Sequence, residues 1–377
     1  MFTFTWKRLF LVFAIAVISV FAISCSDDDD DGPSTTGSNP TTSGETTAAT
    51  STSAETTTAA TTSAATTSAP ADTGPAIKLG FSAWPGWFPW QVAEEMGFFE
   101  EAGIDVELVW FEGYLDSINA FAAGQLDANT QTLNDTLASV AAGCAQRIVL
   151  VNDNSTGNDQ IIVTADITSI EDLVGKEIGI EVGVVDHFLL ALGLEDAGLS
   201  LDDVNVVSLE TGAAAAAFSA GQLDAVGAFA PFTTQALTRE GSHILFDSSD
   251  FPGAIPDHLV VSGELVDERP EVVQGLINAW YLTLAFIEEN PDEAIEIMAE
   301  RAGVTVEEYM EYDAGTTLFS IDDNIAAFEP GDDITHLDYA AAEIAAFLVE
   351  VGFVEGEFEY PMMLDRQFVE AYKAANP

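Results

Sequence analysis

Short alternating stretches and longer amphipathic ones follow each other along the chain after residue 75. Ile77–Phe81 alternates as a half-buried strand does, and Gln91–Glu101 gathers its apolar side chains on one side before Gly103, as a helix does. This order continues to about Ser262, and the pattern beyond Arg269 is helical. Further strands are predicted at 104–111, 147–151, 160–164, 177–181, 204–208, 223–229 and 259–262, and further helices at 114–123, 170–174, 187–194, 213–220, 270–289, 291–302, 306–312, 321–328 and 339–350. Strands alternating with helices predict an α/β fold with mainly parallel sheets.

One phrase occurs twice in this pattern. AFAAGQLDA at Ala120–Ala128 returns as AFSAGQLDA at Ala217–Ala225, with eight of nine positions identical. Each copy joins an alanine-rich helix to a strand, with Gly as the helix stop. A spacing of about one hundred residues exceeds the period of a solenoid and predicts two similar lobes with a ligand cleft between them. The alternative is a chance similarity of two helix ends.

The first residues have the pattern of a secretory signal. Lys7 and Arg8 precede an apolar run that is shorter than a membrane-spanning helix needs to be. The run ends at Ala22–Cys25 (AISC), which resembles a bacterial lipobox, whose cysteine receives a lipid after cleavage. We expect a signal peptide at 1–24 and lipidation of Cys25; an uncleaved anchor helix with an incidental cysteine is the alternative.

Residues 25–75 form a Ser/Thr/Ala-rich tract that begins with the acidic run Asp27–Asp31. Such a tract has too little apolar surface to offset its chain entropy, and it predicts a disordered stalk. We therefore expect an extracytoplasmic protein that is attached to the cell membrane by a lipid at Cys25. The acidic run opposes attraction to anionic lipid head groups.

Charge and cysteine content exclude several functions. Without Lys7 and Arg8, eight basic residues remain against 63 acidic ones, a balance of −55. Nucleic acid is excluded as a partner, because phosphate binding rests on Lys and Arg patches. Such an excess fits a saline habitat, where salt screens repulsion. Cys144 is the only other cysteine, and the four histidines lack metal-ligand spacing, so we expect neither a metal nor a cofactor.

Several phrases resemble a known family. SIEDLVGKEIG at Ser169–Gly179, GFFEEAGIDV at Gly97–Val106 and the repeated AGQLDA resemble bacterial solute-binding proteins with the type II periplasmic-binding fold, in the nitrate/sulfonate/taurine and thiamine-precursor group. Three more phrases resemble the branch associated with urea-carboxylase-type enzymes, which handles urea- or guanidine-like compounds. They are SAWPGWFPWQVAEEMGFF, NDNSTGNDQIIV and EVGVVDHFLLALGL.

The resemblance implies a monomeric binding protein that delivers a small solute to the permease and ATPase of an ABC importer. It implies lobe 1 at residues 76–163 plus 257–377 and lobe 2 at residues 164–256, each a mainly parallel sheet flanked by helices, with a helical C-terminal region. An enzyme on the same fold is less favoured, since the sequence has no nucleophile–base pair, metal cluster or cofactor loop. A sensor module is the other alternative.

Ligands of open α/β sheets bind beyond the carboxyl ends of the strands. Five stretches fall there: Ser82–Trp90, Thr130–Asp135, Asn152–Asp159, Glu181–His187 and Phe229–Thr233. The tryptophans of the first stretch could stack on a planar or cationic ligand or pack the first helix onto the sheet. Asp135 and Asp186 could bind ligand or cap helices, and His187 could be structural. The candidate ligand-binding residues are Ser82, Trp84, Trp87, Thr132, Asn134, Asp135, Asn158, Asp159, Gly183, Asp186, His187 and Phe229.

The charges in these stretches bear on the ligand class. Nitrate and sulfonate need Arg, Lys or helix N-termini, and no Lys or Arg falls in the five stretches. Asp135, Asp153, Asp159, Glu181 and Asp186 do fall there. The sequence therefore favours a cationic or neutral nitrogen compound such as guanidinium or urea. Helix N-termini alone could still hold an anion, and nitrate, taurine, other sulfonates and a thiamine-precursor pyrimidine remain alternatives.

Overall fold

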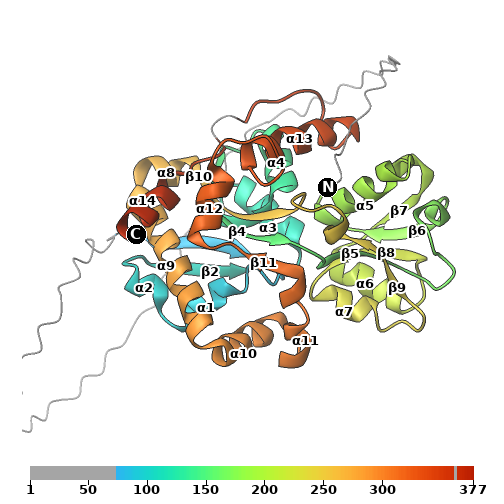
Figure 1. Ribbon diagram of the computed structural model, residues 1–377, viewed down its shortest axis with the longest axis horizontal. Coiled ribbons are helices and arrows are strands. Elements are labelled where there is room, and N and C mark those ends of the chain that lie inside the picture. Colours follow the sequence, from blue (N-terminus) through green and yellow to red (C-terminus); the bar gives the residue numbers. More distant parts are fainter. Residues whose placement is uncertain (1–73, 361–362) are drawn as a thin grey trace, which may run out of the picture. The chain divides into compact units, whose positions relative to one another are not determined.

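The computed structural model describes residues 74–360 and 363–377. The predicted signal peptide, the lipidated Cys25 and nearly all of the predicted stalk lie outside the described residues. The described chain builds two sheets, which define lobe 1 and lobe 2 (Figure 1).

The sheet of lobe 1 has six strands in the order β11-β4-β10-β3-β1-β2. The pairs β1–β2 and β1–β3 at one end of the sheet are parallel, whereas β10 and β11 run antiparallel to their neighbours. The strands are β1 (Ile77–Phe81), β2 (Val106–Trp110), β3 (Ala128–Thr132), β4 (Gln146–Ser155), β10 (Pro256–Ser262) and β11 (Thr316–Leu318). The helices of this part are α1 (Pro89–Glu95), α2 (Phe98–Glu101), α3 (Tyr114–Ala122) and α4 (Leu133–Ala141).

The sheet of lobe 2 has five strands in the order β7-β6-β8-β5-β9. The pairs of β6 are parallel and those of β5 antiparallel. Its elements are β5 (Asp159–Val163), β6 (Glu177–Ile180), α5 (Val185–Asp196), β7 (Asn205–Ser208), α6 (Thr211–Ser219), β8 (Ala225–Phe229), α7 (Phe232–Ala236) and β9 (His243–Asp247), with short 3-10 turns at Ile170–Leu173, Leu201–Asp203 and Ser248–Asp250. The expected two-lobe α/β fold is confirmed, but the sheets are mixed rather than mainly parallel, because β5 and β10, where the chain enters and leaves lobe 2, run antiparallel to their neighbours.

The chain after β10 is helical apart from β11, and it packs on lobe 1. The long helix α9 packs against α1 and α2, and α13 packs against α4. These later helices are α8 (Gly263–Glu268), α9 (Pro270–Glu289), α10 (Pro291–Ala302), α11 (Val306–Met310), α12 (Ile321–Phe328), α13 (Leu337–Glu350) and α14 (Gln367–Ala375), with a 3-10 turn at Asp313–Gly315.

The change of sheet falls earlier than the predicted lobe boundary at residue 163. β5 (Asp159–Val163), which the prediction assigned to lobe 1, pairs antiparallel with β8 and β9 of the second sheet. The crossing is therefore the short segment between Ser155 and Asp159. The hydroxyls of Ser155 and Ser248 lie 2.7 Å apart, which joins this crossing to the returning one.

The sequence repeat makes the same contacts in both lobes. Asp127 accepts a hydrogen bond from the Lys78 backbone N–H at 2.8 Å, and Asp224 accepts one from Glu177 at 3.0 Å. Leu126 packs where Gly80 has no side chain, and Leu223 packs where Gly179 has none. Because the two copies share the same spacing, Leu and Asp of each copy position the strand that follows beside its neighbouring strand in the same way.

The core of lobe 1 depends on contacts between distant helices. The indole of Trp90 on α1 lies 4.7 Å from that of Trp280 on α9 and stacks on Phe99 at 6.1 Å.

Among the described residues no helix is long and apolar enough to cross a membrane, and no group of His, Cys, Asp and Glu side chains could hold a metal ion.

Asn324 on α12 ties the late helices to the sheet. Its side chain is fully buried, accepts a hydrogen bond from the Val151 N–H at 2.8 Å and donates one to the Val151 carbonyl at 2.9 Å. It therefore satisfies both backbone groups of one residue on β4.

We expect Asn324→Ala to lower the free energy of unfolding by about 2–4 kcal/mol, because both Val151 groups lose a buried partner. Scanning calorimetry would measure this as a lower midpoint. The control Asn205→Ala removes one exposed hydrogen bond, to the Gly175 carbonyl, and should cost less than about 1 kcal/mol. Equal midpoints for the two variants would contradict this role of Asn324.

Candidate functional site

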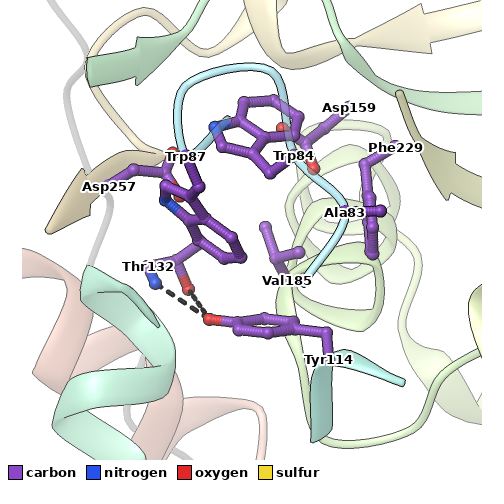
Figure 2. A pocket seen from close by; sticks show the side chains of 9 residues that line it. All are labelled: Ala83, Trp84, Trp87, Tyr114, Thr132, Asp159, Val185, Phe229 and Asp257. Atoms are coloured by element: carbon purple, nitrogen blue, oxygen red, sulfur yellow. Dashed lines mark hydrogen bonds between the residues drawn. The ribbon is translucent and has the colours of Figure 1, made fainter. Parts of the chain in front are cut away.

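A small cavity lies between the two lobes. Lobe 2 contributes Asp159, Val185 and Phe229 to its lining, and lobe 1 contributes the rest (Figure 2). The free volume of the cavity is only about 10 Å³, so in this conformation it is nearly filled by its own side chains. The lining consists of Ala83, Trp84, Trp87, Tyr114, Thr132, Asp159, Val185, Phe229 and Asp257.

Aromatic rings from three elements meet around this space. Trp84 and Phe229 lie 6.4 Å apart at 77°, and Tyr114 and Phe229 lie 6.3 Å apart at 88°, both edge to face. Trp87 lies 5.2 Å from Tyr114. The three tryptophans of this stretch are thus divided: the candidates Trp84 and Trp87, in the turn after β1, line the cavity, whereas Trp90 lies in the core. Aromatic faces of this kind attract planar or cationic groups.

Three carboxyl groups are buried at the same place. Asp153 on β4 accepts a hydrogen bond from the Trp84 indole at 2.9 Å and pairs in register with Asp257 on β10. A Cβ atom on Gly86 would overlap the Asp153 carboxyl group, so the turn packs directly on it. One oxygen of each of Asp153, Asp159 and Asp257 has no hydrogen-bond partner among the described residues. Buried polar groups are rarely left unpaired, and these three oxygens indicate a binding site.

Burial changes the proton affinity of these groups. It raises the pKa of Asp153 to about 8, with repulsion from Asp159 adding to the effect. Burial likewise raises the pKa of Asp159 to about 7, and that of Asp257 well above its usual value, with Asp153 as the main charged neighbour. Removing a carboxylate from water disfavours its charged form unless a cation compensates it.

No basic side chain supplies that compensation within the described residues. Arg147, Lys176, Arg366 and Lys373 form ion pairs with other acids. Arg239 donates to backbone carbonyls, and Arg301 lies over the Trp110 ring at 3.8 Å. The cavity lining contains neither Lys nor Arg.

Asp135 belongs to a buried network at the edge of the cavity. It accepts hydrogen bonds from the Thr132 hydroxyl at 2.6 Å and from the Asn134 amide at 2.7 Å, and the Thr132 N–H donates to the Tyr114 hydroxyl at 2.9 Å (Figure 2). Burial raises the pKa of Asp135 to about 7. Asp135 is therefore not the N-cap of α4, which is the position of Thr132.

Four of the predicted residues line a second, larger cavity of about 270 Å³. They are Asn134, Asp135, Gly183 and His187, and the lining also includes Leu348 near the end of α13 and Gly352 and Phe353 just after it. The His187 ring lies 4.3 Å from that of Phe353, and its Nδ1 accepts from the Gly183 N–H at 3.3 Å. Burial lowers the pKa of His187 to about 4. As ligand contacts, these residues remain predictions.

Ser82, Asn158 and Asp186 lie outside both linings. Asp186 accepts backbone hydrogen bonds from Glu181 at 2.9 Å and His187 at 3.0 Å, but it is the second residue of α5, whose N-cap position is Val184. Asn158 donates to the Tyr312 carbonyl and the Thr316 hydroxyl, both at 2.7 Å, and fixes the crossing to lobe 1. The Ser82 hydroxyl is buried beside β1.

Sequence reasoning did not include Tyr114, Val185, Ala83 and Asp257 among the candidate residues. The available signal for Asp257 was its place at the predicted return crossing. Tyr114 follows the end of β2 as the first residue of α3, a position that the strand-end rule could have included.

The comparisons with known proteins agree with this architecture. The family model described as NMT1/THI5 like matches residues 84–294, and the chain belongs to this family. A binding protein of Brucella abortus (strain 2308) is 30% identical over 213 residues, which cover 55% of this chain and 66% of that protein. The taurine-binding periplasmic protein of Escherichia coli (strain K12) is 28% identical over 183 residues, covering 47% of this chain and 56% of that protein. The matches thus span less than two thirds of these relatives.

A solved structure shows the same fold. The alkanesulfonate-binding protein SsuA from Xanthomonas axonopodis pv. citri, bound to MOPS, superposes with a TM-score of 0.67 at 18% identity, covering 78% of this chain and all of that one. The relatives named here are binding proteins, in agreement with the expectation that the chain is not an enzyme.

The raised pKa values predict how stability depends on pH. A carboxyl group that holds its proton more tightly when folded stabilises the fold below its unfolded pKa of about 4, and this contribution is lost as pH rises through the folded value, about 7 for Asp159 and about 8 for Asp153. Burial lowers the pKa of His187 and His258. These two groups therefore reduce the stability of the fold as pH falls below about 6.5, their unfolded pKa.

Between about pH 6.5 and 8.5 the midpoint of the ligand-free protein should therefore fall. In Asp153→Asn the fall should be smaller, because the amide does not ionise. Thermal unfolding at fixed ionic strength would measure both. Parallel midpoint curves for wild type and variant would contradict the pKa assigned to Asp153.

Proposed function

We propose that this protein is the solute-binding component of an ABC importer and that it captures a small nitrogen-containing solute, guanidine- or urea-like, between its lobes. The family and the position of the cavity between two lobes support a binding protein that closes by hinge motion. The chain would release its ligand to a membrane permease with its ATPase, as a monomer tethered outside the cytoplasmic membrane by a lipid at Cys25.

One observation carries the choice of ligand. Three buried carboxyl groups each have an oxygen without a partner among the described residues, and two of them, Asp159 and Asp257, line a cavity with aromatic walls and no basic side chain. A guanidinium ion presents several N–H donors in a plane and a delocalised positive charge. It would satisfy the free oxygens of Asp159 and Asp257, stack on the indole of Trp84 and offset the buried negative charge. Urea offers the same donors without the charge.

A second candidate rests on the relatives. The taurine-binding protein of Escherichia coli and the alkanesulfonate-binding protein of Xanthomonas are named for anionic or zwitterionic sulfonates. A sulfonate needs donors, and the cavity lining offers it the indole N–H of Trp87 but no cationic side chain. Taurine also carries an ammonium group, which the carboxylates could bind, so taurine is the sulfonate that fits this site best.

A thermal-shift panel would identify the ligand class. It would use the full-length protein in molar salt with guanidinium at low millimolar concentration, urea, methylguanidine, nitrate, taurine and an aminopyrimidine. A ligand that binds only the folded state raises the midpoint by mass action. We expect guanidinium to give the largest shift. A shift with taurine alone would contradict the proposed ligand and favour the sulfonate candidate, and a shift with nitrate alone would contradict both.

Removing one carboxylate from the site should weaken binding of a cation. We expect Asp257→Asn to raise the Kd for guanidinium about 10- to 100-fold, the effect of losing a charge-assisted hydrogen bond. The control Asp105→Asn makes the same charge change at an exposed position of lobe 1 and should leave the Kd within about twofold. Isothermal titration calorimetry measures both values, and an unchanged Kd in Asp257→Asn would place the ligand elsewhere.

A further inference from the structure

The carboxyl group of Glu181 joins the two lobes through backbone N–H groups. Glu181 follows β6 of lobe 2 and is buried. Its Oε1 accepts a hydrogen bond from the Leu115 N–H of lobe 1 at 3.1 Å. Its Oε2 accepts from the Thr211 N–H at 3.2 Å and from the Thr211 hydroxyl at 2.7 Å, within lobe 2. One side chain thus binds both sides of the cleft.

Both partners of Glu181 lie at the start of a helix. Leu115 is the second residue of α3, and Thr211 is the first residue of α6; each helix has nine residues. The first N–H groups of a helix have no partner within it and carry the positive end of the helix dipole. They form an anion-binding position, and here the protein's own carboxylate occupies it.

We propose that Glu181 is an internal anion that holds the lobes together when they close and that excludes anionic solutes from the helix N-termini at the cleft. This inference deepens the proposed function, because it gives a physical reason for a preference against anions. The absence of basic residues does not by itself exclude an anion, because helix N-termini alone can bind one. The carboxylate of Glu181 would close that remaining route. In α5 the first turn is likewise occupied, by Asp186.

The same contact positions the cavity. Tyr114, which lines the cavity, directly precedes Leu115 at the start of α3. When Glu181 binds the Leu115 N–H, the Tyr114 ring lies 6.3 Å from Phe229 of lobe 2. Closure through Glu181 therefore brings the aromatic wall together.

The negative charge of Glu181 also acts on the site. Besides burial, repulsion from Glu181 raises the pKa of Asp135 and of Asp186. A cation in the cleft would relieve this repulsion, whereas an anion would add to it. The set of hydrogen bonds from Glu181 to Leu115 and Thr211, here called the clasp, and a cationic ligand thus favour the same closed state.

Hydrogen exchange followed by mass spectrometry tests the clasp without any ligand. In the full-length protein, Glu181→Gln should speed exchange in peptides that cover Leu115 and Thr211, because an amide replaces one of the two accepting oxygens. The matched control is Glu210→Gln. Glu210 is exposed and caps the same helix α6 through Gly212 and Ala213, and the hydrogen bonds of its side chain stay within lobe 2. It should speed exchange at α6 and leave Leu115 unchanged.

Equal exchange at Leu115 in wild type and in Glu181→Gln would overturn the clasp. Because this measurement needs no solute, it stands even if guanidinium gives no thermal shift, an outcome that would count against the proposed function alone. Circular dichroism melting would show that both variants remain folded.

Glu181→Ala tests the exclusion of anions, since it frees the helix N–H groups and leaves space beside them. We expect added sulfate or taurine to slow exchange at Leu115 and Thr211 in Glu181→Ala and to leave the wild type unchanged. Glu210→Ala is the control for the general stabilising effect of sulfate. Slowed exchange in the wild type, or none in Glu181→Ala, would overturn the exclusion.

Discussion

Burial of carboxyl groups without basic partners is the constraint that the rest of this structure depends on. Removing a carboxylate from water is unfavourable by several kcal/mol unless a proton, a hydrogen-bond donor or a cation compensates it. The chain uses hydrogen-bond donors for Asp135, Asp186 and Glu181, namely hydroxyl and backbone N–H groups. At Asp153 and Asp257 the donors do not suffice, and each keeps an oxygen without a partner among the described residues. The third compensation, a cation, is the one that the proposed ligand would supply.

The fold places these groups together through its crossing strands. β4 carries Asp153, β10 carries Asp257 and β5 begins with Asp159, and all three strands start or end where the chain changes lobe. The carboxyl groups therefore lie at the hinge, and Trp84, Tyr114 and Phe229 approach them from the two lobes. A ligand bound here would contact both lobes beside the crossing segments, so that its binding free energy would act directly on the proposed hinge motion.

Local patterns predicted the elements, but the site depended on distant pairings. Alternation and helix periodicity located most strands and helices, and the repeat marked equivalent corners of the two lobes. The separation of Trp84 from Trp90 could not be seen in their even spacing, because Trp90 packs against Trp280, far along the chain. Asp257 reaches the cavity only because β10 inserts between β3 and β4. No local signal distinguished Asn158, which holds the crossing, from Asp159 next to it, which lines the cavity.

The aromatic walls have a consequence for competition with inorganic ions. A chain this acidic attracts alkali cations, and carboxylate oxygens are the ligands that hard metal ions prefer. A sodium or potassium ion also needs oxygen ligands on its remaining sides, where this cavity presents the carbon faces of Trp84, Tyr114 and Phe229. The proposed organic cation would be bound by both kinds of surface, whereas an alkali ion would lose water on the sides that face the rings and gain no oxygen ligand there. The rings would thus let the carboxylates select a scarce organic ion from a medium rich in salt.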